Sequence, residues 1–292
     1  MLRLAKVHKL AEHLQATAWM GSIGCIVTWI AYRLGFFRFK APSPNVLIST
    51  PSLIEILGIF IVVSLLGPLF LIHVMTPIGK TAGVTNSDWI LFLMTSVQLA
   101  SQILITFLIA LYAFAHKRID LKGIFKTSKS SIWNDIGFGL FAWIVSFPVV
   151  ATIDGLMESF NLYVFGREGP SQLAIQFILS LARSPNYLMI GILITVIAAP
   201  FIEEFIFRGC LQTYLRKRMH RKQAIVLSSI AFAFVHLAPT QGIGNIPLFT
   251  SIFAFGLYLG FVYERQGSLF ASIALHSTFN AISIGRILVI GT

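Results

Sequence analysis

The sequence predicts an all-α fold, a polytopic bundle of about eight membrane-spanning helices. Three observations lead to this prediction. Of the 292 residues, 56% are hydrophobic and only 11% are charged, whereas soluble domains carry about 25% charged residues. The mean hydropathy is +0.82. The apolar residues fall in long runs, and about 20 consecutive apolar residues span a bilayer as a helix, whose backbone satisfies its own hydrogen bonds in lipid.

Eight apolar runs account for the expected helices. Charged residues or the helix-interrupting residues proline and glycine separate them. The runs are Ala16–Tyr32, Ser52–Met75, Trp89–Ala115, Ile132–Ile153, Tyr187–Phe207, Ala224–Leu237, Leu248–Tyr263 and Leu269–Ile290.

The same pattern divides the chain into four parts. Residues 1–15 are basic and amphipathic, which predicts an interfacial N-terminal segment, and residues 16–160 form a four-helix membrane part. Residues 161–186 are rich in glycine and proline, which predicts an interfacial or re-entrant connector. Residues 187–292 form a C-terminal membrane part, which carries the polar motifs described below.

The net charge of +11 raises the question of nucleic-acid binding. The basic residues lie in short connections between apolar runs, notably at 116–129 and 216–222. Lipid phosphates and the positive-inside rule explain this placement, so we expect membrane lipids and no nucleic acid as partners. The two cysteines, Cys25 and Cys210, lie far apart in apolar sequence and show no metal-ligand spacing.

Two adjacent carboxylates, Glu203 and Glu204, follow a stretch that contains no charged residue from 184 to 202. A charged side chain at the centre of a membrane helix costs about 2.5–3.5 kcal/mol. One interpretation is a helix end at the membrane surface, neutralised by Arg208, which lies four residues after Glu204 on the same helix face. The other interpretation is a functional site inside the membrane.

Polar groups on two further apolar segments favour the functional interpretation. His236 ends one segment, and His276 and Asn280 lie four residues apart on one face of another. Polar groups in membrane helices face the bundle interior, so these side chains are expected to converge. A carboxylate beside an imidazole takes a proton from water, and a second imidazole and an amide stabilise an oxyanion. The set therefore predicts a water-activating hydrolase, and no GxSxG motif indicates a serine nucleophile.

The three motifs, Glu203-Glu204-x-x-x-Arg208, Phe232-x-x-x-His236 and His276-x-x-x-Asn280, resemble those of the CAAX-protease and bacteriocin-processing (Abi) family of intramembrane glutamate-dependent endopeptidases. The family includes the Ras-converting prenyl-protein endopeptidases. The resemblance implies that Glu203 and His236 activate water and that His276 and Asn280 line the oxyanion hole. It gives Glu204, Arg208 and Phe232 supporting or substrate-orienting roles. It also implies a protein or lipidated-peptide substrate and no metal cofactor.

Three alternatives remain open at this stage. A zinc-dependent metalloprotease would use Glu203, Glu204, His236 and His276 as ligands. A proton-coupled transporter would use the same residues as a relay, and an immunity or scaffold protein would bind a peptide without cleaving it. The expected location is multi-pass in the plasma membrane of a bacterium or the endoplasmic reticulum of a eukaryote.

Overall fold

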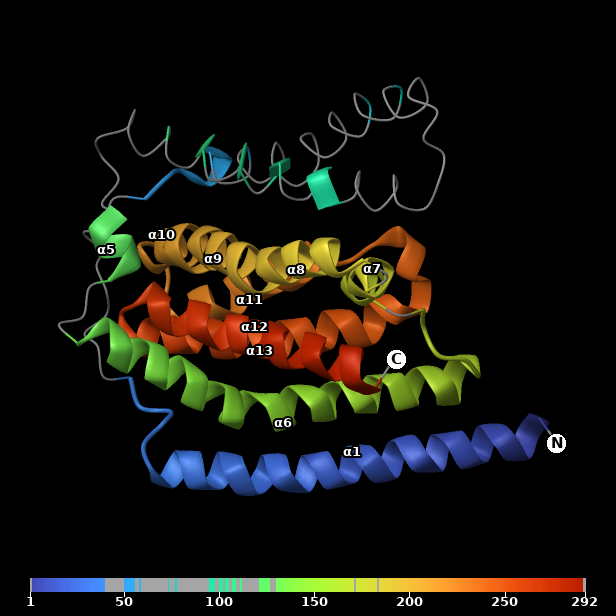
Figure 1. Ribbon diagram of the computed structural model, residues 1–292. Helices are drawn as coiled ribbons and strands as arrows, with labels where there is room; N and C mark the ends of the chain where they lie inside the picture. The colour runs from blue at the N-terminus through green and yellow to red at the C-terminus, as the bar shows by residue number, and fades with distance from the viewer. Residues whose placement is uncertain are drawn as a thin grey trace.

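The computed structural model describes residues 2–39, 50–55, 121–126, 130–170, 172–182 and 184–290, with scattered residues between 58 and 111. The described residues are mostly helical and include ten α-helices, which are stacked in layers (Figure 1). The expected helices Ser52–Met75 and Trp89–Ala115 lie for the most part outside the described residues.

The first layer is α1, Leu2–Arg33, which packs along α6, Ile132–Phe165. Figure 1 shows the two helices side by side at one edge of the bundle. Helix α1 runs without a break through residue 16, where the sequence suggests a boundary between an interfacial segment and a first span.

Helix α6 is longer than its apolar run indicates. The hydroxyl of Ser131 accepts a hydrogen bond from the Trp133 amide and caps the start of the helix. The expected end at Ile153 is wrong, because the helix continues through Asp154 to Phe165 and ends at Gly166, whose φ is 68°. A charged side chain ends an apolar run but leaves the backbone hydrogen bonds intact, whereas a left-handed glycine ends the helix itself.

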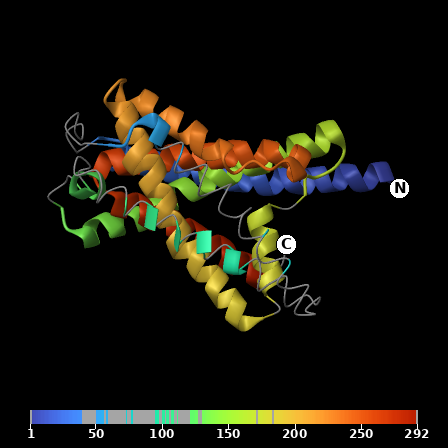
Figure 2. The same ribbon diagram turned by 90° about the horizontal axis from the view of Figure 1, so that it is seen from above.

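A continuous helical segment of 32 residues, Pro185–Arg216, carries the first motif. It follows the short helix α7, Leu173–Leu181, which packs against it. Seen from above, the segment lies obliquely to α1, α6 and α12 (Figure 2). Two π-helical stretches interrupt its α-helical hydrogen bonding, so that it consists in order of α8 (Pro185–Leu193), η2 (Ile194–Ala198), α9 (Ala199–Glu204), η3 (Phe205–Gln212) and α10 (Thr213–Arg216).

The remaining helices complete the C-terminal part. Helix α12 packs against both α6 and α11, and α13 packs against α6 and against the segment that carries Glu203. These elements are α5 (Leu121–Phe125), α11 (Arg221–Phe234), the 3₁₀ helix η4 (Pro239–Gly244), α12 (Asn245–Gln266) and α13 (Leu269–Ile290).

Four helical segments are long and apolar enough to cross a membrane among the residues that the structure describes. They are Val7–Arg33, Ile132–Phe165, Pro185–Arg216 and Pro239–Gln266. The chain is therefore an integral, multi-pass membrane protein. The structure shows four such segments in its described part, and the expected count of eight stays a prediction.

The basic connections meet at one end of the bundle. The Arg265 guanidinium at the end of α12 donates to the carbonyl oxygens of Gly35 and Arg38, at 3.4 and 3.3 Å. The chain at Lys126 bridges to Ser268. Cationic residues from distant parts of the sequence thus share one end of the bundle.

Close packing of α6 on α13 depends on Gly139. A Cβ at this position would collide with the carbonyl oxygen of Ala271 and lie 2.8 Å from the Ala274 side chain. We expect Gly139→Ala to lower the free energy of unfolding by about 1–3 kcal/mol, the cost typical of overpacking. Thermal unfolding in detergent measures the change. Gly137→Ala is the matched control on the same helix, because a Cβ there meets nothing within 4 Å; equal melting temperatures for the two variants would contradict the expectation.

Candidate active site

Three of the motif side chains meet between α9, α13 and the end of α11. Oε2 of Glu203 lies 3.7 Å from Nε2 of His236 and 3.8 Å from Nε2 of His276. Both distances are too long for a direct hydrogen bond. Among the described residues, this carboxylate oxygen is buried without a hydrogen-bond partner. The group thus leaves one acceptor facing two imidazole nitrogens.

His236 is held by the end of its own helix. Its backbone amide donates to the Ala233 carbonyl at 3.2 Å, which frees the Phe232 carbonyl that an α-helix would have used. Nδ1 of His236 lies 2.7 Å from that free carbonyl oxygen. A carbonyl only accepts hydrogen bonds, so Nδ1 carries the hydrogen. In the neutral ring, Nε2 is therefore an acceptor, and it faces Glu203.

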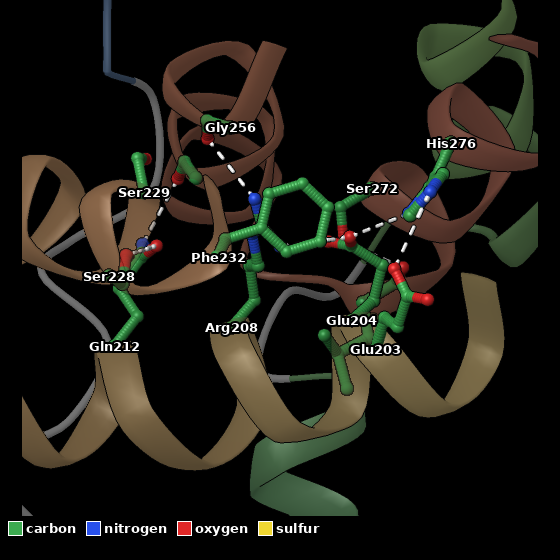
Figure 3. A network of polar contacts seen from close by, with 12 residues as sticks. Glu203, Glu204, Arg208, Gln212, Ser228, Ser229, Phe232, Gly256, Ser272 and His276 are labelled. Atoms are coloured by element: carbon green, nitrogen blue, oxygen red, sulfur yellow. Dashed lines mark hydrogen bonds and ion pairs between the residues drawn. The ribbon is translucent and has the colours of Figure 1, made fainter. Parts of the chain in front are cut away.

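Glu204 faces the opposite side of His276. Its Oε1 lies 3.0 Å from Nδ1 of His276 and accepts a hydrogen bond of 3.1 Å from Nη1 of Arg208. The Arg208 guanidinium also donates to the Gly256 carbonyl at 3.3 Å and lies 4.2 Å from the centroid of the Phe232 ring. Figure 3 shows Glu203 and Glu204 beside His276, with Arg208 between Phe232 and Gly256. The i, i+4 pair expected from the sequence is a buried salt bridge.

Solvent exposure separates the two carboxylates. The side chains of Glu203 and His236 are 30% and 29% exposed, whereas those of Glu204 and Arg208 are fully buried. His276 lies between them at 6%. Glu203 and His236 are therefore accessible from outside the bundle, whereas Glu204 and Arg208 are enclosed and contact the exposed pair only by way of His276.

Aromatic rings surround the two imidazoles. The Phe232 ring meets His236 and His276 edge to face, with centroids 4.7 and 5.8 Å apart. Phe255 of α12 meets His276 in the same way at 5.4 Å. These contacts restrict the rotation of both imidazoles. Phe255 has no counterpart in the three motifs, and nothing in the local sequence distinguishes it from other apolar residues.

Asn280 lies one turn after His276 on α13, but its amide is engaged elsewhere. Nδ2 of Asn280 donates to the carbonyl oxygen of Thr195 at 2.9 Å. Thr195 belongs to η2, the π-helical stretch before Glu203. The resemblance implies that the Asn280 amide lines an oxyanion hole. In the structure, this amide already donates a hydrogen bond to a backbone carbonyl.

A second buried polar network continues along the same helix face toward the basic end. Nε2 of Gln212 donates to the Gly260 carbonyl at 3.1 Å and to Glu264 at 3.2 Å, and Oε1 accepts from Ser228 at 3.0 Å. A Cβ at Gly260 would lie 2.7 Å from Oε1 of Gln212, so glycine permits this approach. Spacing by four residues from Glu204 through Arg208 to Gln212 would have indicated the network from sequence alone.

The arrangement does not match a metal site. Within the described part of the chain, no group of three or more His, Cys, Asp or Glu side chains is placed to hold a metal ion. Glu204, one of the four residues named as zinc ligands from the sequence, is bound to the Arg208 cation.

Comparison with known protein families bears on residues 185–282, which match the family model "Type II CAAX prenyl endopeptidase Rce1-like". Residues 185–282 form an Rce1-like domain. This domain spans 98 of the 292 residues and contains all three motifs. The family that this model describes is one of prenyl endopeptidases. The match does not address a role in bacteriocin immunity. Searches of curated proteins and of solved structures found no match.

Proposed function

We propose that the protein is an intramembrane endopeptidase that hydrolyses a peptide bond with water activated by Glu203 and His236. The observation that carries the proposal is the position of the Glu203 carboxylate oxygen, 3.7 and 3.8 Å from Nε2 of two histidines. This oxygen is buried without a hydrogen-bond partner among the described residues, whereas the Glu203 side chain as a whole is 30% exposed. The Rce1-like domain supports the same reaction class.

The tautomer of His236 supports a water between the two groups. Nε2 of neutral His236 and the carboxylate of Glu203 are both acceptors, so they attract each other only through a bridging donor. A water molecule there donates one hydrogen to each, which directs its oxygen lone pairs toward a substrate carbonyl. Glu203 takes the proton as the water oxygen forms a bond to the carbonyl carbon, and the carbonyl electron pair moves to the oxygen.

His276 is placed to stabilise the resulting oxyanion. Because Nδ1 of His276 donates to Glu204, a hydrogen on Nε2 makes the ring an imidazolium, whose charge is balanced by Glu203 and Glu204. Nε2–H then donates to the oxyanion. Arg208 holds Glu204 in place and stays buried throughout. When the C–N bond breaks, the proton on Glu203 moves to the leaving nitrogen, which returns the site to its starting state.

The surface beside His236 supports a membrane-bound substrate. Phe234 and Val235, which directly precede His236, are 62% and 40% exposed. An apolar surface next to a reactive group suits a peptide that carries a lipid or lies in the bilayer. We propose a protein or lipidated peptide as the substrate class. The similarity to a CAAX prenyl endopeptidase family favours a prenylated peptide within this class.

The test is cleavage by purified protein reconstituted in lipid vesicles. Prenylated and unmodified peptides of the same sequence are incubated with it, and products are identified by mass spectrometry, with hydroxylamine present in parallel. Direct attack by water gives a free carboxylate as the only new C-terminus. A hydroxamate product would reveal an acyl-enzyme and overturn the proposal, as would the absence of cleavage of membrane peptides of either kind.

Metal removal is expected to leave the activity intact. Glu204 is bound to Arg208, and no group of three or more metal-ligating side chains is found among the described residues. Incubation with 1,10-phenanthroline followed by gel filtration should therefore change kcat less than about twofold. Elemental analysis of the same sample measures bound zinc. Stoichiometric zinc whose removal abolishes cleavage, and whose return restores it, would instead support a metalloprotease.

A further inference from the structure

One backbone carbonyl beside the site has lost its helical donor. In η2 the amide of Ala199 donates to the carbonyl of Ile194, five residues earlier. In the same register, the next carbonyl, that of Thr195, would accept from the amide of residue 200. That residue is Pro200, which has no N–H. The π-helical register and the proline together leave the Thr195 carbonyl without a backbone donor.

Asn280 supplies the missing donor from another helix. Its Nδ2 lies 2.9 Å from the Thr195 carbonyl oxygen, and the two residues are 85 positions apart in the chain. Lipid offers no hydrogen bonds, so a carbonyl freed inside a membrane bundle requires a partner from the protein. The amide side chain of Asn280 therefore closes the gap that Pro200 opens.

This hydrogen bond connects the two helices that carry the reacting groups. Thr195 lies eight residues before Glu203, and Asn280 lies four residues after His276. The Glu204–His276 contact of 3.0 Å is a second connection between the same helices. One contact alone would leave α13 free to pivot about it, whereas two contacts at different heights oppose both rotation and sliding of α13 against this segment. His276, whose Nε2 lies 3.8 Å from Glu203, is between the two contacts and the reacting group.

We propose that Asn280 is a positioning residue, whose amide binds the carbonyl that Pro200 frees and so holds His276 in register with Glu203. This inference rests on the proposed function of the same site. It differs from an oxyanion role, in which the Asn280 amide would act on the substrate. The two roles make opposite predictions about Pro200, because only the positioning role depends on the missing backbone N–H.

The test is rescue of one substitution by another. We expect Asn280→Ala to lower kcat about 100-fold with little change in KM, the loss expected when a reacting group moves by about 1 Å. Pro200→Ala restores an N–H that can reach the Thr195 carbonyl in the π-helical register. The double variant Pro200→Ala/Asn280→Ala is then expected to have a kcat within about twofold of Pro200→Ala alone. Cleavage kinetics in vesicles measure both constants.

Thermal unfolding of the wild type, the two single variants and the double variant gives a measurement that does not depend on activity. The melting temperature should fall in Asn280→Ala and return in the double variant to that of Pro200→Ala, even if the protein cleaves no peptide. Asn161→Ala is the matched control, because Nδ2 of Asn161 also donates to a backbone carbonyl, that of Ile243, at 2.9 Å. Pro200→Ala should not restore its melting temperature.

The outcomes separate the possibilities. Rescue of both melting temperature and kcat supports the proposal. Rescue of the melting temperature without kcat overturns the positioning role and makes Asn280 a direct oxyanion donor. If Pro200→Ala does not restore the melting temperature of Asn280→Ala, a backbone N–H at residue 200 does not replace the Asn280 amide, and the proposal is overturned. Failure of the wild-type protein to cleave any peptide would refute the proposed function and leave the unfolding result to decide the inference.

Discussion

Replacing Glu203 by glutamine is expected to lower kcat for peptide cleavage by about 10³–10⁴-fold, the upper part of the range for removal of a general base. Glutamine keeps the size and polarity of the side chain but cannot take a proton from water. Because the Glu203 side chain is partly exposed and lies beyond direct hydrogen-bond distance of both His236 and His276, the variant should fold and bind substrate normally. The expected loss is therefore in kcat, with KM little changed.

Steady-state cleavage in vesicles measures this effect, and a melting curve of each protein establishes that the fold is intact. Glu12→Gln is the control, since Glu12 is an exposed residue of α1 whose described ion partner is His8. That variant should cleave as fast as wild type. Full turnover by Glu203→Gln would assign water activation to another group and contradict the mechanism.

Replacing Arg208 by methionine is expected to lower the free energy of unfolding by about 3–5 kcal/mol, the cost of removing one partner of a buried ion pair. Methionine fills similar volume but leaves the Glu204 carboxylate buried beside His276 without its cation. The hydrogen bond to Gly256 and the contact with the Phe232 ring are lost as well. Chemical or thermal unfolding in detergent measures the change.

A double variant separates the charge from the packing. Glu204→Gln/Arg208→Met removes both charges, so we expect it to recover part of the stability that Arg208→Met loses. Cleavage should stay low in both variants, because Arg208→Met removes the cation that holds Glu204 in place and the double variant also removes the carboxylate at Nδ1 of His276. If the double variant were no more stable than Arg208→Met alone, the salt bridge would not be the origin of the loss.

These two experiments assign different tasks to neighbouring carboxylates. Glu203 and Glu204 are adjacent in the sequence, and a helix turns them about 100° apart. One is partly exposed and faces both Nε2 atoms, whereas the other is buried and holds Nδ1 of His276 and Arg208. A catalytic loss without a stability loss at Glu203, and a stability loss at the Glu204–Arg208 pair, would establish this division.

The membrane class and the local pairs follow from the sequence, because they depend on composition and on short spacings. Apolar length alone indicates helices in lipid. The i, i+4 relation places Glu204 beside Arg208, and the structure contains that ion pair. The sequence predicts the ends of helices less well. Hydropathy predicts that one helix ends at Ile153, whereas α6 continues to Phe165 and is followed by a glycine in the left-handed conformation.

Only the tertiary structure decides which distant groups meet. His276 reaches Glu204 across 72 positions and Asn280 reaches Thr195 across 85. These contacts depend on the crossing of α13 with a helix whose register is shifted by π-helical turns at η2 and η3, a property that hydropathy and spacing do not encode. The sequence therefore predicts which residue types form the site. Which side chains contact each other depends on how the two helices are rotated and shifted against each other.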